Sequence, residues 1–139
     1  MRVVVKPGRW RQARPSEDIP VSLLEKYLRL RVFLERMVDE KTAEVISAYI
    51  YENLRYLSQR ELDAVASMIR YRVKHWGRVT LEEVVEAVEY FKSGRKVTVR
   101  VALDKELVDR LREISRGLLF DRVVADLLWK ALINYSKNK

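Results

Sequence analysis

The chain has 139 residues, of which 48% are hydrophobic and 35% charged, with a net charge of +8 and no cysteine. Disulfides, thiolate zinc sites and a cysteine nucleophile are therefore excluded, and no apolar run approaches the roughly 18 residues that a membrane helix needs. Without a signal-peptide pattern at the amino terminus, we expect a cytoplasmic protein with no membrane partner. The chain has only five Asn and Gln residues beside its many charged ones, a composition typical of thermophiles.

Residues 1–18 are predicted to form a basic N-terminal arm. The first 15 residues carry five basic side chains and no acidic one, with too few apolar residues for a core. Such an arm can lie along phosphates or enter the minor groove, and an indole can stack on a base. The candidate contacts are Arg9, Trp10, Arg11 and Arg14. The alternative is a tail anchored only by a short strand at Val3 to Val5.

Residues 19–94 are predicted to form a helical bundle of four helices. Three segments fit the capping box that marks a helix start, namely Ser22–Glu25, Ser58–Glu61 and Thr80–Glu83. Another helix should begin near Thr42, and Gly77 should end the third helix. Residues 16–94 have 12 basic and 14 acidic side chains, so we expect a polyanion to be held by the two ends of the chain rather than by the middle.

Two charged surfaces of this bundle have open interpretations. A basic cluster with interleaved aromatic rings is formed by Arg70, Tyr71, Arg72, Lys74, His75, Trp76 and Arg78. It is either a second nucleic-acid patch or a set of cations favoured locally at a helix C-terminus. An acidic side is formed by Glu82, Glu83, Glu86 and Glu89. It is either a solvated face or a surface for a partner protein.

Catalysis finds no support in the residue inventory. His75 is the only histidine, and the four glycines form no phosphate-binding loop. The acidic side chains lack a second cluster that would complete a metal site. We therefore expect a protein that is not an enzyme and that has no cofactor.

Residues 95–139 are predicted to form one strand followed by two amphipathic helices. The apolar face of the strand would carry Val97, Val99, Val101 and Leu103. The opposite face would carry Lys96, Thr98, Arg100 and Ala102. Asp104 should cap the first helix and Gly117 should end it, and the second helix has an apolar stripe from Val123 to Tyr135. The segment has 11 basic and 6 acidic side chains.

A lone strand leaves its backbone N–H and C=O groups unpaired, and no second alternating run stands nearby. We therefore expect the strand to pair with the same strand of a second copy, so that the chain dimerises. The resulting two-stranded ribbon has the width to enter the major groove of DNA.

These features resemble the ribbon-helix-helix family of DNA-binding proteins, which includes the CopG, Arc and MetJ repressors. The resemblance covers about a third of the chain and is carried by the VTVRVAL strand, the Asp104 cap, Leu107, Val108, Leu111, Ala131, Leu132 and Tyr135. It implies a mainly α fold in which an N-terminal four-helix region precedes a C-terminal ribbon-helix-helix (βαα) unit that forms an intertwined homodimer.

The resemblance also implies which residues meet DNA. Base contacts would come from Thr98, Arg100 and Ala102, and Lys96 is added because it lies on the same face of the strand. Phosphate contacts would come from Arg95, Arg116 and Arg122 around the ribbon and the second helix. Two positions depart from the family pattern. Ala102 offers a base only a methyl contact, and Asp121 places an acid near the expected phosphate.

The predicted function is that of a homodimeric protein that binds specific sequences in double-stranded DNA, as a transcriptional repressor. The helical region would extend the dimer, join dimers into a higher oligomer on DNA, or bind another protein. An alternative is a DNA-segregation adaptor that binds a centromere-like site and recruits an ATPase, because similar plasmid partition proteins place the ribbon-helix-helix behind a basic arm. A third interpretation is an antitoxin.

Overall fold

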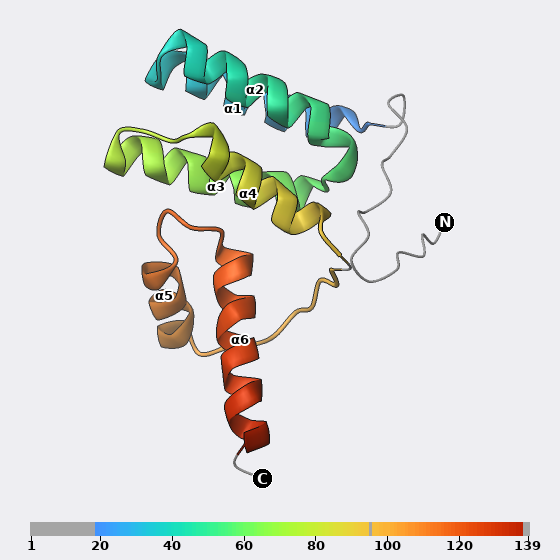
Figure 1. Ribbon diagram of the computed structural model, residues 1–139, viewed down its shortest axis with the longest axis vertical. Coiled ribbons are helices and arrows are strands. Elements are labelled where there is room, and N and C mark those ends of the chain that lie inside the picture. The colour runs from blue at the N-terminus through green and yellow to red at the C-terminus, as the bar shows by residue number, and fades with distance from the viewer. Residues whose placement is uncertain (1–18, 95, 138–139) are drawn as a thin grey trace.

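The computed structural model describes residues 19–94 and 96–137 (Figure 1). The regular elements of the described part of the chain are all helices. Its elements are α1 (Val21–Met37), α2 (Glu40–Asn53), the 3-10 turn η2 (Leu54–Tyr56), α3 (Gln59–Trp76), α4 (Leu81–Lys92), α5 (Lys105–Ile114) and α6 (Phe120–Lys137).

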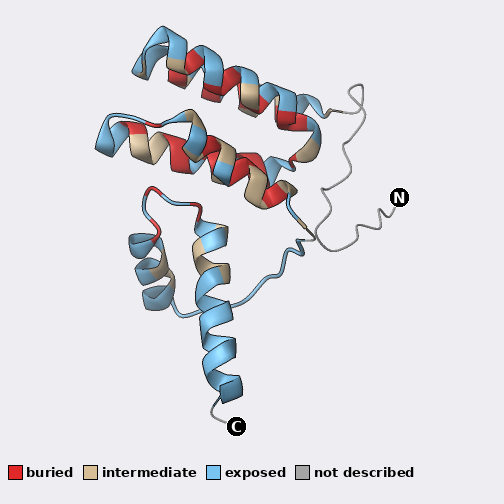
Figure 2. Cartoon of the chain, viewed as in Figure 1, coloured by how far each residue is buried: buried red, intermediate tan, exposed pale blue. Residues whose placement is uncertain are grey.

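The first four helices form two layers around one core. Helix α1 packs against α2 and α3, and α4 packs against α2 and α3, so each hairpin covers the other. The buried side chains face the space between the layers (Figure 2). The largest fully buried ones include Leu23, Leu30, Leu34, Ile46, Ile50, Leu62, Ile69 and Phe91. The predicted helical region is thus a four-helix core.

Two of the predicted capping boxes are confirmed. The Ser58 backbone N–H donates to Glu61 Oε1 at 2.9 Å, and the Glu61 N–H donates to Ser58 Oγ at 3.1 Å. The same reciprocal pair at Thr80 and Glu83 has distances of 2.7 and 3.3 Å. Each box satisfies two backbone donors that a helix start leaves without intrahelical partners. Gly77, with φ of 77°, ends α3 as predicted.

The predicted box at Ser22 is wrong. Helix α1 begins at Val21, and its N-cap is Pro20, which makes no side-chain cap hydrogen bond. The fixed φ of the proline ring suits a helix start, and the Pro20 carbonyl accepts from the N–H groups of Leu23 and Leu24. The second helix begins at Glu40, because the Asp39 carboxylate accepts from the Thr42 N–H at 3.0 Å.

The predicted C-terminal βαα ribbon is also wrong, because the described residues contain no strand. Residues 96–104 form an irregular connection without turns that runs from α4 to α5 (Figure 1). Alternation gives a segment one apolar face, but a strand also requires a neighbouring strand to pair its backbone groups. No described segment of this subunit supplies that neighbour. "Mainly α" is correct, whereas the ribbon and the intertwined arrangement built on it are not.

Helices α5 and α6 attach to the bundle through the loop that joins them. Leu119 in this loop is only 4% exposed and belongs to the same core as the buried residues of α1 to α4. Arg72 of α3 donates to the Gly117 carbonyl at 2.6 Å, and Arg60 pairs with Asp121 at 2.8 Å. Helix α6 then runs away from the bundle, with α5 beside its first half (Figures 1 and 2). Asp104 is the N-cap of α5 but makes no side-chain cap hydrogen bond.

Among residues 19–94 and 96–137, no helix has both the length and the apolar character needed to cross a lipid bilayer.

Candidate nucleic-acid interface

The segment predicted to read DNA bases is largely exposed. Thr98, Arg100 and Ala102 are all solvent-accessible. Lys96 is held back at the end of α4, because its Nζ donates to the Ser93 carbonyl at 2.6 Å and lies 4.7 Å from the centroid of the Tyr90 ring. Arg100 therefore offers the accessible guanidinium of this segment to an anionic ligand.

The same part of the chain exposes an extensive apolar surface. We define the C-terminal apolar surface as the exposed residues Val97, Val99, Val101, Leu103, Leu107, Ile114, Leu127, Leu128, Trp129, Leu132 and Ile133. Val97 is 80% exposed and Leu128 is 64% exposed, and neither α5 nor α6 contains a buried residue. Large exposed apolar side chains gathered in one part of a chain are typical of surfaces that associate with another molecule.

The predicted phosphate contacts have different surroundings. Arg116 is exposed in the loop after α5. Arg122 lines a cavity of about 280 Å³ between α4 and α6, together with Glu83, Glu86 and Asp126. Because those carboxylates line the same cavity, a phosphate at Arg122 would meet unfavourable negative charge. Arg95 lies outside the described residues, as do Arg9, Trp10, Arg11 and Arg14 of the arm.

The electrostatics around Tyr90 reflect the same contact between α4 and α6. Burial raises the pKa of the Tyr90 hydroxyl, and the negative charges of Asp121 and Asp126 raise it further. Arg122 acts in the opposite direction. The start of α6 therefore carries a mixed field in which acids outnumber the one arginine, and it is not a purely basic phosphate site.

The basic cluster at the end of α3 is divided among several contacts. Arg72 binds Glu83 and the Gly117 carbonyl, so it joins parts of the fold. Arg70 and Lys74 lie 5.6 and 5.8 Å from the centroid of the Phe33 ring of α1. Cation–π contacts of this kind explain their placement without a ligand. Their side chains are not brought together with Arg100.

The acidic side of α4 has a role that sequence reasoning missed. Glu83 pairs with Arg72, and Glu86 faces the cavity that holds Arg122. Four glutamates on one helix indicated either a solvated face or a partner surface. Glu83 instead pairs with Arg72 of α3, and Glu86 acts electrostatically on the same arginine. These glutamates follow Arg72 by 11 and 14 positions along the chain, so the pairing carries no local signal.

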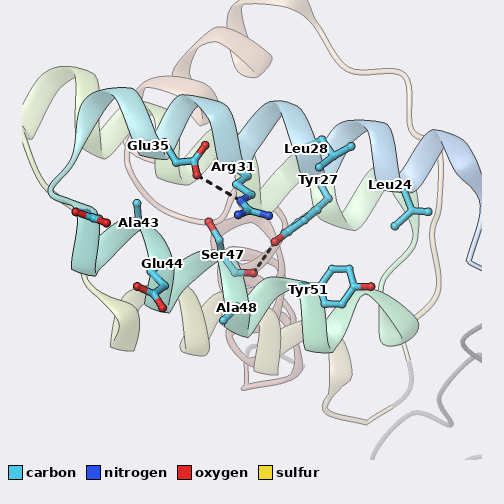
Figure 3. A pocket seen from close by; sticks show the side chains of 11 residues that line it. Leu24, Tyr27, Leu28, Arg31, Glu35, Ala43, Glu44, Ser47, Ala48 and Tyr51 are labelled. Carbon is cyan, nitrogen blue, oxygen red and sulfur yellow. Dashed lines mark hydrogen bonds and ion pairs between the residues drawn. The ribbon is translucent and has the colours of Figure 1, made fainter.

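A groove on the outer side of α1 and α2 was also missed. It has a volume of about 930 Å³. Figure 3 shows side chains of both helices pointing into it, including Tyr27 and Tyr51. The Tyr27 hydroxyl donates to the Ser47 carbonyl at 3.1 Å, and Arg31 pairs with Glu35 at 3.5 Å. A sequence shows an amphipathic helix but not the gap that remains between two of them.

Within the described ranges, no three His, Asp or Glu side chains are grouped so that they could hold a metal ion. No protein-family model matches the chain, and neither a curated protein nor a solved structure matches it. Function is therefore inferred from the side chains themselves.

Proposed function

We propose that the chain is a homodimeric, sequence-specific DNA-binding protein that acts as a transcriptional repressor, and that it binds its target without catalysing a reaction. The observation that carries this proposal is the coexistence, in residues 96–137, of the C-terminal apolar surface with an excess of basic side chains. The apolar part provides for association with a second copy, and the basic part provides for a polyanion.

The dimer follows from the energetics of the exposed apolar side chains. Burying one large aliphatic side chain contributes about 1.5–3 kcal/mol, so an α6 that leaves Leu128, Trp129 and Leu132 exposed gains substantially from a partner. A second copy supplies an equally apolar surface, and a twofold axis places that surface against itself. We therefore expect the C-terminal apolar surfaces of two subunits to cover each other.

DNA binding follows from what the dimer leaves outside. Thr98 and Arg100 are solvent-accessible and do not belong to the C-terminal apolar surface, so covering that surface would leave them available to DNA. An arginine is the side chain best suited to bind guanine in a bidentate manner. Arg116 would hold a phosphate and position the subunit. Two symmetric copies would then read an inverted repeat.

Repression would result from occupancy, because a dimer bound over a promoter excludes other proteins from it. Such a protein acts at the nucleoid, in the cytoplasm of its cell. The bound sequence is best found by selection of DNA from a random pool, with the mass of each complex measured in parallel. An inverted repeat bound by two chains is the expected result.

The Arg100→Ala variant tests the reading residue. We expect it to cost about 1–3 kcal/mol at the selected site and to relax specificity there. Arg116→Ala is the matched control, because loss of a phosphate contact weakens all sequences alike and lowers the salt slope by about 1. Unchanged specific binding by Arg100→Ala, or a chain that stays monomeric on DNA, would contradict the proposal.

A second candidate function is that of a DNA-segregation adaptor that recruits an ATPase. The groove on α1 and α2 favours it, because that layer lies on the far side of the bundle from α5 and α6 (Figure 1). A DNA-bound dimer would therefore leave the groove accessible. Co-purification of a Walker-type ATPase with the DNA-bound protein would favour the adaptor over the repressor.

A further inference from the structure

The groove between α1 and α2 lies on the side of these helices that faces away from the core (Figure 3). Its lining residues are Leu24, Tyr27, Leu28, Arg31, Glu35, Glu40, Ala43, Glu44, Ser47, Ala48 and Tyr51. Along α1 it extends from Leu24 to Glu35, which corresponds to about three helical turns. It is therefore long enough to hold a short helix.

The shape of the groove suits an apolar ridge. The α2 side of the groove has small side chains at Ala43, Ser47 and Ala48, and the larger Leu28 and Tyr51, which are each about half exposed, also line it. Small residues allow another backbone to approach closely, and exposed apolar walls gain from being covered. This is the shape that helix-in-groove recognition requires.

One polar atom of the groove lacks a partner. Ser47 is only 5% exposed. Its side-chain hydroxyl is buried and has no hydrogen-bond partner among the described residues. The Tyr27 hydroxyl goes to the Ser47 carbonyl and not to this oxygen. A buried hydroxyl without a hydrogen bond is unfavourable.

The charges of the groove discriminate among possible occupants. Arg31 is paired with Glu35, whereas Glu40 and Glu44 take part in no ion pair within the described part of the chain. The lining is therefore net negative. DNA would be repelled by it, and a second copy that docked groove to groove would bring the same excess of negative charge. A helix with Lys or Arg beside its apolar ridge is complementary to it.

We propose that the α1–α2 groove binds an amphipathic helix of a partner protein, with an apolar ridge that enters the groove and basic side chains that meet Glu40 and Glu44. This partner site lies on the opposite layer from the C-terminal unit (Figure 1). The proposal does not depend on what α5 and α6 bind.

Three synthetic helical peptides, each about 16 residues long so that helix formation is favourable, provide the probes. The first has a leucine ridge with i, i+4, i+7 and i+11 spacing and lysine flanks. The second has the same ridge with glutamate flanks, and the third keeps the lysines but scrambles the ridge. Fluorescence anisotropy with the full chain should show binding of the first peptide, at least tenfold tighter than that of the other two.

Variants of the groove locate the binding. Ala48→Trp fills the groove from an exposed helical position and should weaken binding of the first peptide at least tenfold. Val45→Trp adds the same ring to an exposed position of α2 outside the groove and should leave the affinity unchanged. Replacing both Glu40 and Glu44 by Lys should reverse the preference, so that the glutamate-flanked peptide binds more tightly. Circular dichroism of each variant confirms that it is folded.

Equal affinity for the lysine-flanked and glutamate-flanked peptides would overturn the proposal, as would an Ala48→Trp variant that binds as well as the parent chain. Sedimentation provides a separate measurement. An assembly larger than a dimer that is lost in Ala48→Trp would show that a second copy occupies the groove, which also overturns it. DNA binding by Ala48→Trp should match that of the parent chain, so failure here is distinguishable from failure of the proposed DNA-binding function.

Discussion

Arg72 Nε donates a hydrogen bond to the Gly117 carbonyl at 2.6 Å, although 45 positions separate the two residues in the chain. The same guanidinium pairs with Glu83 and lies 4.9 Å from the centroid of the Trp76 ring. Only 13% of its side chain is exposed. One arginine of α3 therefore joins α4 to the loop between α5 and α6, and it fixes the orientation of the C-terminal unit on the bundle.

Replacing Arg72 by Ala should lower the free energy of unfolding by about 1–3 kcal/mol, because it leaves the Gly117 carbonyl without this hydrogen bond and removes the ion pair of Glu83. Arg72→Lys should recover only part of the loss, since an ammonium cannot bind both groups with the planar geometry of a guanidinium. Urea unfolding measures both variants. An Arg72→Ala protein as stable as the parent would show that the contact does not hold the two parts together.

Gly117 should be intolerant of a side chain for two separate reasons. Its φ of 75° is a left-handed conformation, and an added Cβ would overlap the Trp76 ring. Gly77 has nearly the same φ of 77° but has no atom within 4 Å of such a Cβ. Gly77→Ala should therefore cost about 1–2 kcal/mol from backbone conformation alone, and Gly117→Ala should cost more.

The difference between these two glycine variants isolates the steric part. Adding Trp76→Ala to Gly117→Ala should recover much of the excess, because it removes the ring that the new methyl group meets. Thermal unfolding of the single and double variants provides the comparison. Equal losses for Gly77→Ala and Gly117→Ala would argue that the loop moves away from α3 at no cost.

Leu119 should contribute to the stability of the whole protein, whereas its neighbour Leu118 should not. Leu119 is 4% exposed within the core, and Leu118 is 45% exposed. Leu119→Ala should cost about 2–5 kcal/mol, as is usual when a buried leucine is truncated, and Leu118→Ala should stay within about 0.5 kcal/mol of the parent chain. Denaturant titration of the pair tests this. A large loss for Leu118→Ala would place that side chain in an interface instead.

Local signals predicted the helices well where a cap or a glycine marks a boundary. The Ser58 and Thr80 boxes and the stop at Gly77 depend on side chains within a few residues of the boundary, so their pattern is readable in one stretch of sequence. Pro20 displaced the box expected at Ser22 because a proline with suitable φ starts a helix without a side-chain cap.

The other errors concern contacts between distant parts of the chain. Alternation from Val97 to Leu103 predicts an apolar face, but only a neighbouring strand can make the segment a strand. The roles of Arg72 and of Leu119 were not predictable either, because each depends on how the loop between α5 and α6 packs against the bundle. The groove between α1 and α2 likewise arises from the packing of two helices, each of which has an ordinary amphipathic pattern.

Tyr49 should make the stability of the bundle sensitive to alkaline pH. Burial between α2 and α4, with a smaller effect of the Glu89 charge, raises the pKa of Tyr49 to about 12 from an ordinary value of 10.0. Below pH 10 the hydroxyl is protonated in both the folded and the unfolded chain, and its contribution to stability is fully present. Above pH 10 the unfolded chain loses the proton first, so the free energy of unfolding falls as pH rises toward 12.

The Tyr49→Phe variant removes this ionisation while keeping the ring. Its free energy of unfolding should fall less steeply between about pH 10 and 12 than that of the parent chain. The difference between the two slopes should correspond to at most one proton released on unfolding. Urea unfolding at a series of pH values measures the slope, and absorbance of the ionised phenol should lose its most alkaline component in the variant. Identical slopes for the two proteins would mean that Tyr49 titrates in the folded chain as it does in the unfolded one.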